Sequence, residues 1–250
     1  MGKMRRSHRR RRGRFAFLLK VFAFIVAAAA MLWAVALFFR MDHIAVSGNE
    51  RYSEAEVLAA SGLQTGGNLY FLNKFDVKEA IFKQLPYVET VKINRKLPDT
   101  MLIELSECKA AAGVQSENGV WLINDHGKLL EEVETPPVGC PTVIGAALIE
   151  PEATKTADPD EAFAYRFGVA LTLLREAESR GMREKIGQID LADDTALSFT
   201  YLGRFTVCLP WTADVAYKLE SLRTVVDYLE NNETGRIDLM TEGKASFIPE

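Results

Sequence analysis

The hydrophobic pattern begins with one long apolar run, from Val21 to Phe39, that contains neither a charge nor a helix breaker. A helix rises about 1.5 Å per residue, so this run would span about 28 Å, close to the hydrocarbon thickness of a bilayer. Nine Lys and Arg residues precede the run, and a long acidic sequence follows Arg40. The positive-inside tendency then predicts a transmembrane helix over 21–39, with residues 1–20 as a basic cytoplasmic arm and the chain after Arg40 outside.

A cleaved secretory signal is the alternative for the same segment. Such a signal has a shorter apolar core and then a small-residue site, and Ala34-Val35-Ala36 could serve as that site. The apolar run continues past it through Leu37-Phe38-Phe39, so cleavage would leave three large apolar side chains at a new N-terminus. An Arg-Arg pair before the run also permits a twin-arginine signal. The length and apolarity of the run favour a retained anchor.

Alternating and helical patterns follow the anchor in the order β-α-α-β-β. A short strand is predicted over 41–47, and helix starts are predicted at Ser53, which has Glu56 as its capping-box partner, and at Asp76. Two further strands alternate over 88–94 and 101–105, with a turn between them. The pattern predicts a three-stranded sheet covered by two helices. Such a unit leaves a strand edge open to another chain.

The remaining chain, residues 108–248, is predicted as a mixed domain dominated by sheet. Helices are predicted to open at Asp158-Pro159 and to run from Thr212 to about Asn231. The predicted strands cover 120–123, 128–133, 186–191, 196–201, 205–209, 237–240 and 243–248. The predicted fold class is therefore α+β: a single-pass anchor, a β-α-α-β-β domain over 41–107 and a sheet-rich domain over 108–248.

Charge narrows the choice of partners. The net charge is −4, but residues 1–40 hold ten basic side chains and no acidic one. Residues 41–250 therefore carry 20 basic and 34 acidic side chains, which argues against nucleic-acid binding by the external part. Next to a membrane span, the basic arm is more typical of a topology signal that contacts anionic lipid headgroups than of a nucleic-acid site.

Cysteine usage gives no sign of a metal site or a disulfide framework. Cys108, Cys140 and Cys208 are odd in number and widely spaced, without metal-ligand spacing. The expectation is buried free thiols, although the spacing leaves one disulfide open.

Candidate catalytic groups are weak. Ser106 and Lys109 have the spacing of a penicillin-recognising nucleophile pair, but they fall at a strand end, where positions i and i+3 face opposite ways, and the companion motifs are missing. His126 beside Asp125 falls in a predicted hairpin turn, and no nucleophile elbow accompanies it. We therefore expect no catalytic, cofactor-binding or metal-binding residues and no small-molecule substrate. The sequence predicts a binding protein.

Three segments carry a resemblance to a known family. Val46-Ser47-Gly48-Asn49 with Tyr52-Ser53, the Gly-x-Asn-Leu of 66–69, and Asn94-Arg95-Lys96-Leu97-Pro98 leading to Glu107 resemble a POTRA domain. They are similar to the form that follows the anchor in FtsQ/DivIB bacterial cell-division proteins. The order of arm, span, POTRA domain and β-rich domain matches that family along essentially the whole chain. Two sites depart from the family pattern: Glu107-Cys108-Lys109-Ala110 lacks the Pro of the family's Glu-Arg-x-Pro, and Cys140 stands in place of Leu.

The resemblance implies a non-enzymatic scaffold in the cytoplasmic membrane, enriched at the division septum. It implies binding of the coiled-coil pair of FtsB/DivIC and FtsL type, and a part in coordinating septal peptidoglycan synthesis. Strand addition at an open edge near the C-terminus is the expected physical route. The candidate partner-binding residues are Ile237, Asp238, Leu239, Met240, Ala245 and Phe247.

Several alternatives remain open at this point. Ile237 and Leu239 could simply fill the core of the last strand, and the POTRA edge around 94–100 is a second possible surface. A membrane-anchored cell-envelope enzyme with an unrecognised site is the competing function, and a deep pocket with converging polar groups in 108–248 would favour it. A barrel-assembly POTRA protein would need a C-terminal run of amphipathic strands, which this chain lacks.

Overall fold

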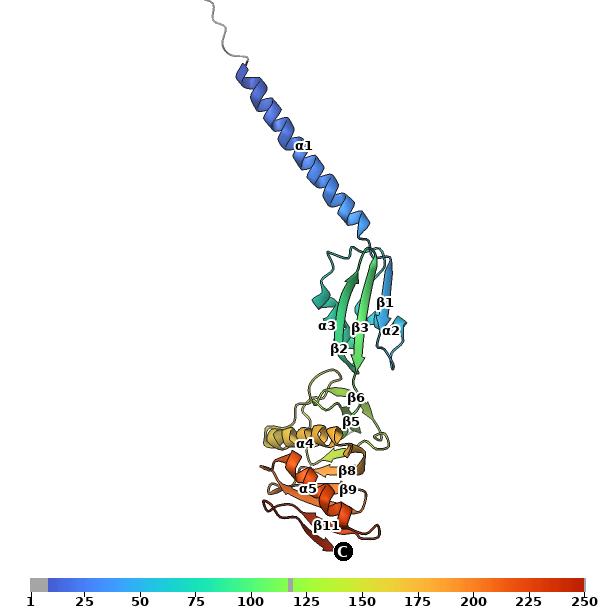
Figure 1. The fold of residues 1–250 in the computed structure, drawn as a ribbon, viewed down its shortest axis with the longest axis vertical. Helices are drawn as coiled ribbons and strands as arrows, with labels where there is room; N and C mark the ends of the chain where they lie inside the picture. The colour runs from blue at the N-terminus through green and yellow to red at the C-terminus, as the bar shows by residue number, and fades with distance from the viewer. Residues whose placement is uncertain (1–8, 117–118, 250) are drawn as a thin grey trace, which may run out of the picture. The chain divides into compact units, whose positions relative to one another are not determined.

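The computed structural model describes residues 9–116 and 119–249 of the 250-residue chain, with side chains for 17–34, 38–116 and 119–249 (Figure 1). The chain divides into two compact units. The first comprises Met1–Ile81 and Thr90–Ser106, and the second comprises Phe82–Glu89 and Glu107–Glu250. The boundaries between the units therefore fall within α3 (Lys74–Gln84), β2 (Val88–Lys96) and the last residues of β3 (Thr100–Glu107).

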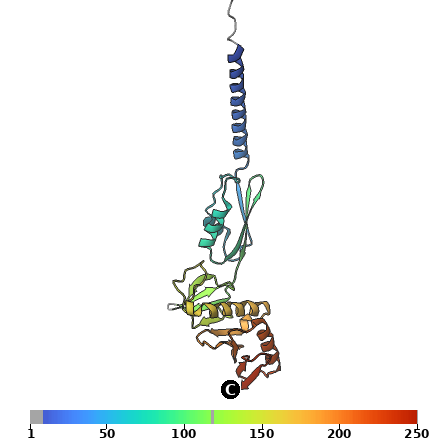
Figure 2. The ribbon, with the colours of Figure 1, turned by 90° about the vertical axis from the view of Figure 1, so that its left-hand side faces the viewer.

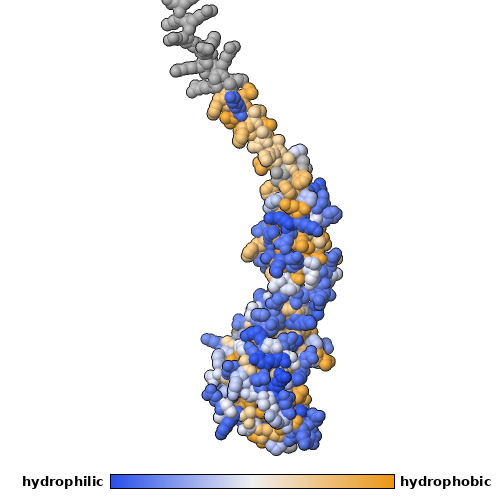
Figure 3. All heavy atoms as spheres, in the orientation of Figure 1, coloured by the Kyte–Doolittle hydropathy of each residue, from blue (hydrophilic) through white to orange (hydrophobic). Residues whose placement is uncertain are grey.

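The first unit opens with one long helix, α1 (Arg9–Phe38). It extends further toward the N-terminus than the predicted span of 21–39, because the residues before Lys20 are mostly Arg, Leu and Phe and include no proline. Residues 1–8 of the predicted basic arm lie outside the described residues. Within the described chain, α1 is the one helix long and apolar enough to cross a membrane; the window Phe17–Ala34 has mean hydropathy 2.3 and is not buried (Figure 3). An N-terminal apolar helix that fits a single-pass anchor is thus confirmed.

The rest of the first unit has the predicted order β-α-α-β-β, which the structure confirms. Its three-stranded sheet has the order β1-β3-β2, with β1 and β3 parallel. The helices lie on one face of this sheet (Figure 2). Alternate strand residues are buried, among them Val91, Ile93, Met101 and Ile103. Its elements are β1 (His43–Ser47), α2 (Glu54–Ser61), α3 (Lys74–Gln84), β2 (Val88–Lys96) and β3 (Thr100–Glu107).

The two helix starts show one correct and one wrong prediction. Ser53 and Glu56 form the predicted capping box of α2. The predicted cap of α3 at Asp76 is wrong, because α3 begins at Lys74 and Asp76 lies within its first turn. Asn73, just before the helix, instead accepts a hydrogen bond from the N–H of Phe75 at 3.1 Å. An Asn carbonyl oxygen satisfies a free helical N–H as well as a carboxylate does, so the earlier residue starts the helix.

The second unit is built on a nine-stranded sheet with the order β12-β11-β10-β9-β8-β7-β4-β5-β6. The pairs β4–β7, β7–β8 and β10–β11 are parallel, and the others are antiparallel. The sequence pattern missed β4, whose Ala-Gly-Val-Gln sequence shows little alternation, and β7, which has only three residues. The strands are β4 (Ala112–Gln115), β5 (Val120–Ile123), β6 (Leu129–Val133), β7 (Thr142–Ile144), β8 (Ile186–Asp190), β9 (Ala196–Tyr201), β10 (Phe205–Pro210), β11 (Gly235–Asp238) and β12 (Ser246–Pro249).

Two crossover helices cover this sheet, α4 (Glu161–Ser179) between β7 and β8 and α5 (Val215–Tyr228) between β10 and β11. The short 3-10 helix η1 (Arg183–Lys185) follows α4. Strands β7 and β10 run in the same direction and both crossovers step toward β12, so right-handed connections put both helices on one face. The helices contact each other and share one core with the sheet (Figures 1 and 2). The largest fully buried rings in this core are Phe199 and Phe205.

Both crossover helices begin later than predicted. Asp160 caps α4 by accepting from the N–H of Ala162, whereas the predicted start at Asp158-Pro159 belongs to the preceding loop, where the carbonyl of Asp158 accepts from Ile149. The second helix, predicted from Thr212, begins at Val215 after its cap Asp214. In both cases a carboxylate nearer the helix satisfies the first free N–H groups.

The three cysteines are free thiols in the structure; Cys208 is buried and the other two are partly buried. The thiol of Cys108 donates to the carbonyl of Tyr87 at 3.4 Å. Burial and the negative charge of nearby Glu89 raise the pKa of Cys108 to about 11.

We expect iodoacetamide to alkylate Cys108 about 100-fold more slowly at pH 8 than it alkylates an unperturbed thiol, because the thiolate is the reactive form. The folded pKa lies above the unfolded one, so the protonated thiol stabilises the fold at lower pH. That contribution is lost as the pH rises from about 9 through 11. Peptide mass spectrometry of the Cys108 labelling rate against pH measures the pKa of this thiol in the folded protein, and labelling in urea gives the unfolded value as the control. A labelling midpoint near pH 9 in the folded protein would contradict the raised pKa.

Candidate binding edge

The last two strands of the chain form one end of the nine-stranded sheet. Strand β12 pairs with β11 in antiparallel register, and no strand within the described part of the chain pairs with its other side. The hairpin lies beside the C-terminus in Figure 1. Such an edge presents backbone N–H and C=O groups that a further strand could pair with.

The backbone of β11 shows which of its groups turn away from β12. The N–H of Gly235 donates to the carbonyl of Arg204 at 3.2 Å, and the N–H of Leu239 donates to the carbonyl of Cys208 at 2.8 Å. Both bonds run toward β10. Because backbone groups alternate in direction along a strand, Ile237 also directs its N–H and C=O toward β10.

The pairing of β11 with β12 then shows which backbone groups of β12 point toward the open edge. Ile237 lies opposite Phe247, and Gly235 lies opposite Pro249. Since Ile237 points away from β12, its pair with Phe247 is of the non-hydrogen-bonded kind. The N–H and C=O of Phe247 therefore face the open edge.

The six candidate residues fall into three groups by the exposure of their side chains: buried, half-buried and exposed. Ile237 and Leu239 are buried in the core, and Asp238 is half-buried. Met240 is half-buried too, and its N–H donates to the Asp238 carboxylate at 2.9 Å. Ala245 is exposed.

The ring of Phe247 faces inward although its backbone faces outward. It lies edge to face against the core ring of Phe205, with centroids 6.0 Å apart. Recognition at this edge would therefore use the backbone of β12, and the buried side chains would hold that backbone in place.

A buried lysine supports the connection between β11 and β12. Lys218 of α5 is 6% exposed, and its ammonium group donates to the carbonyls of Leu239 at 2.6 Å and Thr241 at 2.9 Å. These bonds hold the segment just after β11 against the helix. This support was not predicted from the sequence, where Lys218 reads as one more charged position of an amphipathic helix.

We expect Lys218→Met to lower the free energy of unfolding by about 1–3 kcal/mol, because it leaves two carbonyls without their donor while keeping the buried stem. Hydrogen exchange of residues 239–248 should accelerate most. Lys185→Met, at an exposed position, is the matched control and should change stability by less than about 0.5 kcal/mol. Equal effects of the two substitutions would contradict the anchoring role of Lys218.

The second predicted surface, residues 94–100, includes the turn between β2 and β3. Leu97 is exposed, whereas Arg95 is engaged: its guanidinium donates to the carbonyls of Leu69 at 2.5 Å and Leu72 at 3.3 Å. Asn94 donates to the carboxylate of Glu104 at 3.2 Å. The side chains of Arg95 and Asn94 thus bond within the first unit itself, and the exposed residues of this surface include the charged Lys96 and the apolar Leu97.

The weak catalytic candidates sit in structural roles. The hydroxyl of Ser106 lies 2.6 Å from that of Thr90. His126 occupies a turn, where Asn124 accepts from its N–H, and its ring nitrogen lies 2.8 Å from the Asp125 carboxylate. Among the described residues, no group of three His, Cys, Asp or Glu is placed to hold a metal ion.

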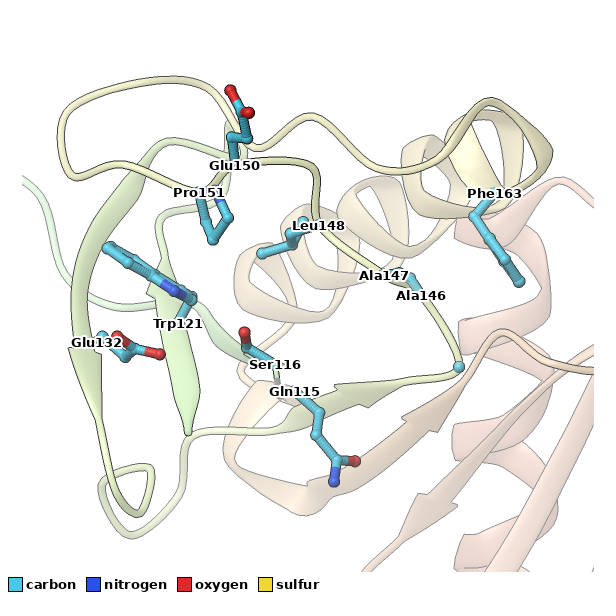
Figure 4. Close-up of a pocket in the computed structure, with 11 residues that line it drawn as sticks. Gln115, Ser116, Trp121, Glu132, Ala146, Ala147, Leu148, Glu150, Pro151 and Phe163 are labelled. Atoms are coloured by element: carbon cyan, nitrogen blue, oxygen red, sulfur yellow. The ribbon is translucent and has the colours of Figure 1, made fainter. Parts of the chain in front are cut away.

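One open hollow of about 880 Å³ lies in the second unit (Figure 4). Trp121 and Leu148 supply much of its wall, and the carboxyl groups of Glu132 and Glu150 come from separate segments and point away from each other. Residues 117–118, next to Ser116, lie outside the described residues. Among the described residues, no buried side-chain nitrogen or oxygen lacks a hydrogen-bond partner. The polar side chains among these described lining residues do not converge, so the hollow does not favour the alternative of an envelope enzyme.

Comparison with known proteins identifies a domain family that matches part of the chain and several similar proteins. Residues 39–107 match the family model of the FtsQ-type POTRA domain. The chain is similar to the cell division protein FtsQ of Corynebacterium glutamicum, with 34% identity over 125 residues, which cover 49% of this chain and 55% of that protein. It is 28% identical to the cell division protein DivIB of Clostridium botulinum over 124 residues, 50% of this chain and 48% of that one.

A further relative is the cell division protein FtsQ of Koribacter versatilis, 27% identical over 163 residues, which cover 64% of this chain and 44% of that protein. The chain spans about half the length of these relatives. The resemblance predicted from the sequence is confirmed by these matches.

Proposed function

We propose that this chain, whose residues 39–107 match the FtsQ-type POTRA domain and whose relatives are named FtsQ and DivIB, is a protein of the FtsQ/DivIB type and a non-enzymatic scaffold of the bacterial division machinery. In this proposal it is anchored in the cytoplasmic membrane through residues 21–39, with residues 1–20 inside the cell. The POTRA domain (41–107) and the β-rich domain (108–248) lie outside, enriched at the division septum. There the protein binds other division proteins and helps coordinate septal peptidoglycan synthesis.

The outward-facing backbone of β12 is the observation that carries the binding part of the proposal. An extended segment of a partner can pair with the N–H and C=O of Phe247, and backbone bonds of this kind give affinity without a deep pocket. The partner we propose is the coiled-coil pair of FtsB/DivIC and FtsL type. Exposed residues near the edge, such as Ala245, would contact its side chains.

The matching test is co-purification of the full chain, tagged and extracted in mild detergent, with the FtsB/DivIC-type and FtsL-type proteins of the same cell. We expect both proteins to be recovered with the chain, and neither to be recovered when Phe247→Pro removes the outward-facing N–H of β12. Recovery of neither protein, together with turnover of a cell-wall fragment by the purified chain, would support the alternative of a membrane-anchored envelope enzyme and overturn the scaffold.

A further inference from the structure

Exposed apolar side chains gather in one part of the POTRA domain. Of the large apolar side chains in residues 39–107, those most open to solvent are Tyr70, Phe71, Phe75 and Leu97, with exposed fractions of 48%, 82%, 78% and 53%. We call these four residues the aromatic patch. Single exposed apolar residues are common on any protein, but three aromatic rings within six residues are typical of an interaction site.

Backbone hydrogen bonds tie the patch to the end of α1. The N–H of Leu69 donates to the carbonyl of Phe39 at 3.0 Å, and the N–H of Met41 donates to the carbonyl of Gly67 at 2.7 Å. The ring of Tyr70 lies edge to face on that of Phe39, with centroids 4.9 Å apart. The loop that carries Tyr70 and Phe71 therefore begins where the apolar run ends.

The turn that carries Leu97 is held at the same place. The N–H groups of Asp42 and His43 donate to the carbonyl of Asp99 at 2.9 Å and 3.2 Å. Asp42 is three residues beyond Phe39, so two separate loops of the first unit meet at the point where the chain leaves the helix. In Figure 3, hydrophobic residues continue from α1 onto this end of the first unit.

Arg95 of β2 holds the loop between Leu69 and Leu72 in place through hydrogen bonds to its backbone. The guanidinium of Arg95 bonds the carbonyls of Leu69 and Leu72 and lies 5.4 Å from the centre of the Tyr70 ring. Lys74 donates to the carbonyl of Ile93 at 2.6 Å. These bonds satisfy backbone carbonyls that would be costly to leave unpaired in a poorly hydrated environment. The loop therefore presents its aromatic rings outward without exposing all of its polar backbone.

We propose that the aromatic patch inserts into the headgroup region of the bilayer that α1 crosses, at the C-terminal end of that helix, and so holds the POTRA domain on the membrane surface. This inference rests on the membrane anchor of the proposed function. Aromatic rings are favoured at the membrane–water interface, where one side is apolar and the other is wet. The exposed Lys96 precedes Leu97 in the sequence, and the exposed Arg40 follows Phe39, whose ring contacts that of Tyr70; both cations are suited to lipid phosphates.

Lipid is the occupant that the continuity with α1 favours. The helix end is bonded to the loop of the patch, so insertion of α1 brings these rings to the bilayer surface without any further association step. A protein partner would have to compete with lipid that is already present at high local concentration.

Photocrosslinking of the full chain in phospholipid vesicles tests the proposal. The photoreactive residue p-benzoylphenylalanine replaces Phe71 in one sample, Trp33 within α1 in a second and Ser106 at the far end of β3 in a third. We expect lipid adducts at position 71 to exceed those at position 106 by more than about tenfold and to approach those at position 33.

The three positions separate the two hypotheses. An absence of lipid adducts at position 33 would remove the anchor and with it the proposed function. Adducts at position 33 without adducts at position 71 would overturn only the insertion of the patch. Crosslinks from position 71 to a second copy of the chain would also overturn it, since they would show that protein covers the rings.

A pair of variants tests whether the rings themselves cause the contact. With the photoreactive residue at Leu97, Phe71→Ser combined with Phe75→Ser is expected to shift the inserted-to-free ratio by about tenfold for each ring removed. The matched variant, Phe71→Leu with Phe75→Leu, keeps apolar surface at both positions and should retain most lipid adducts. Equal adduct yields from the two variants would contradict insertion through these rings.

Discussion

Phe247→Pro is expected to weaken binding of the FtsB/DivIC–FtsL-type pair at least about tenfold relative to Phe247→Ala. Both variants lose the ring that lies on Phe205, so both lose the same packing in the core. Proline also lacks the backbone N–H, and the register of β11 and β12 places the N–H of Phe247 at the open edge. A partner carbonyl that would accept from this N–H is then left unpaired.

Titration calorimetry or surface binding with the full chain in detergent measures the difference. Proline is tolerated on an edge strand where its missing N–H would face outward, so the hairpin should stay folded. Ile248→Pro is the complementary variant. Ile248 directs its N–H toward Arg236 of β11, so loss of this N–H should separate β12 from β11. Equal affinities of Phe247→Pro and Phe247→Ala would contradict recognition through the backbone edge.

Gly48→Ala should lower the free energy of unfolding of the POTRA domain by at least about 3 kcal/mol. Gly48 follows β1 with a φ of +80°, a conformation that L-residues with a side chain rarely adopt. A Cβ at this position would lie 2.0 Å from the backbone carbonyl oxygen of Leu105 in β3. A backbone atom cannot move aside without separating β1 from β3, so strain and clash add.

Gly62→Ala is the matched control for this substitution. Gly62 ends α2 with a φ of +66°, but a Cβ there would meet nothing within 4 Å. We expect it to cost only about 1 kcal/mol, from backbone strain alone. Urea-dependent hydrogen exchange of the amides in β1 and β3 reports on the domain without unfolding the rest of the chain. If both glycine variants lose the same stability, the close approach of Gly48 to Leu105 is not a determinant of the fold.

The local spacing of apolar residues was sufficient to predict most helices and strands of this protein. The uninterrupted apolar run predicted α1, and apolar residues spaced mostly two apart predicted β2 and β3, because the burial of a helix or strand face follows directly from the spacing of apolar residues. The capping box of Ser53 and Glu56 likewise depends on residues three apart. Where several capping residues stand close together, as at Asp158 and Asp160, sequence left the helix start ambiguous by a few residues.

What the sequence by itself determined, then, was the order of elements in the POTRA domain, the apolar anchor and the resemblance of the POTRA segments, all of which rest on neighbours in the chain. Only the tertiary structure decided the position of β4, the strand order that makes β12 an edge, the direction of the Phe247 backbone and the support from Lys218. The same holds for the meeting of two loops of the first unit beside Phe39. Each of these depends on residues far apart in sequence, whose pairing is set by register and packing across the whole sheet.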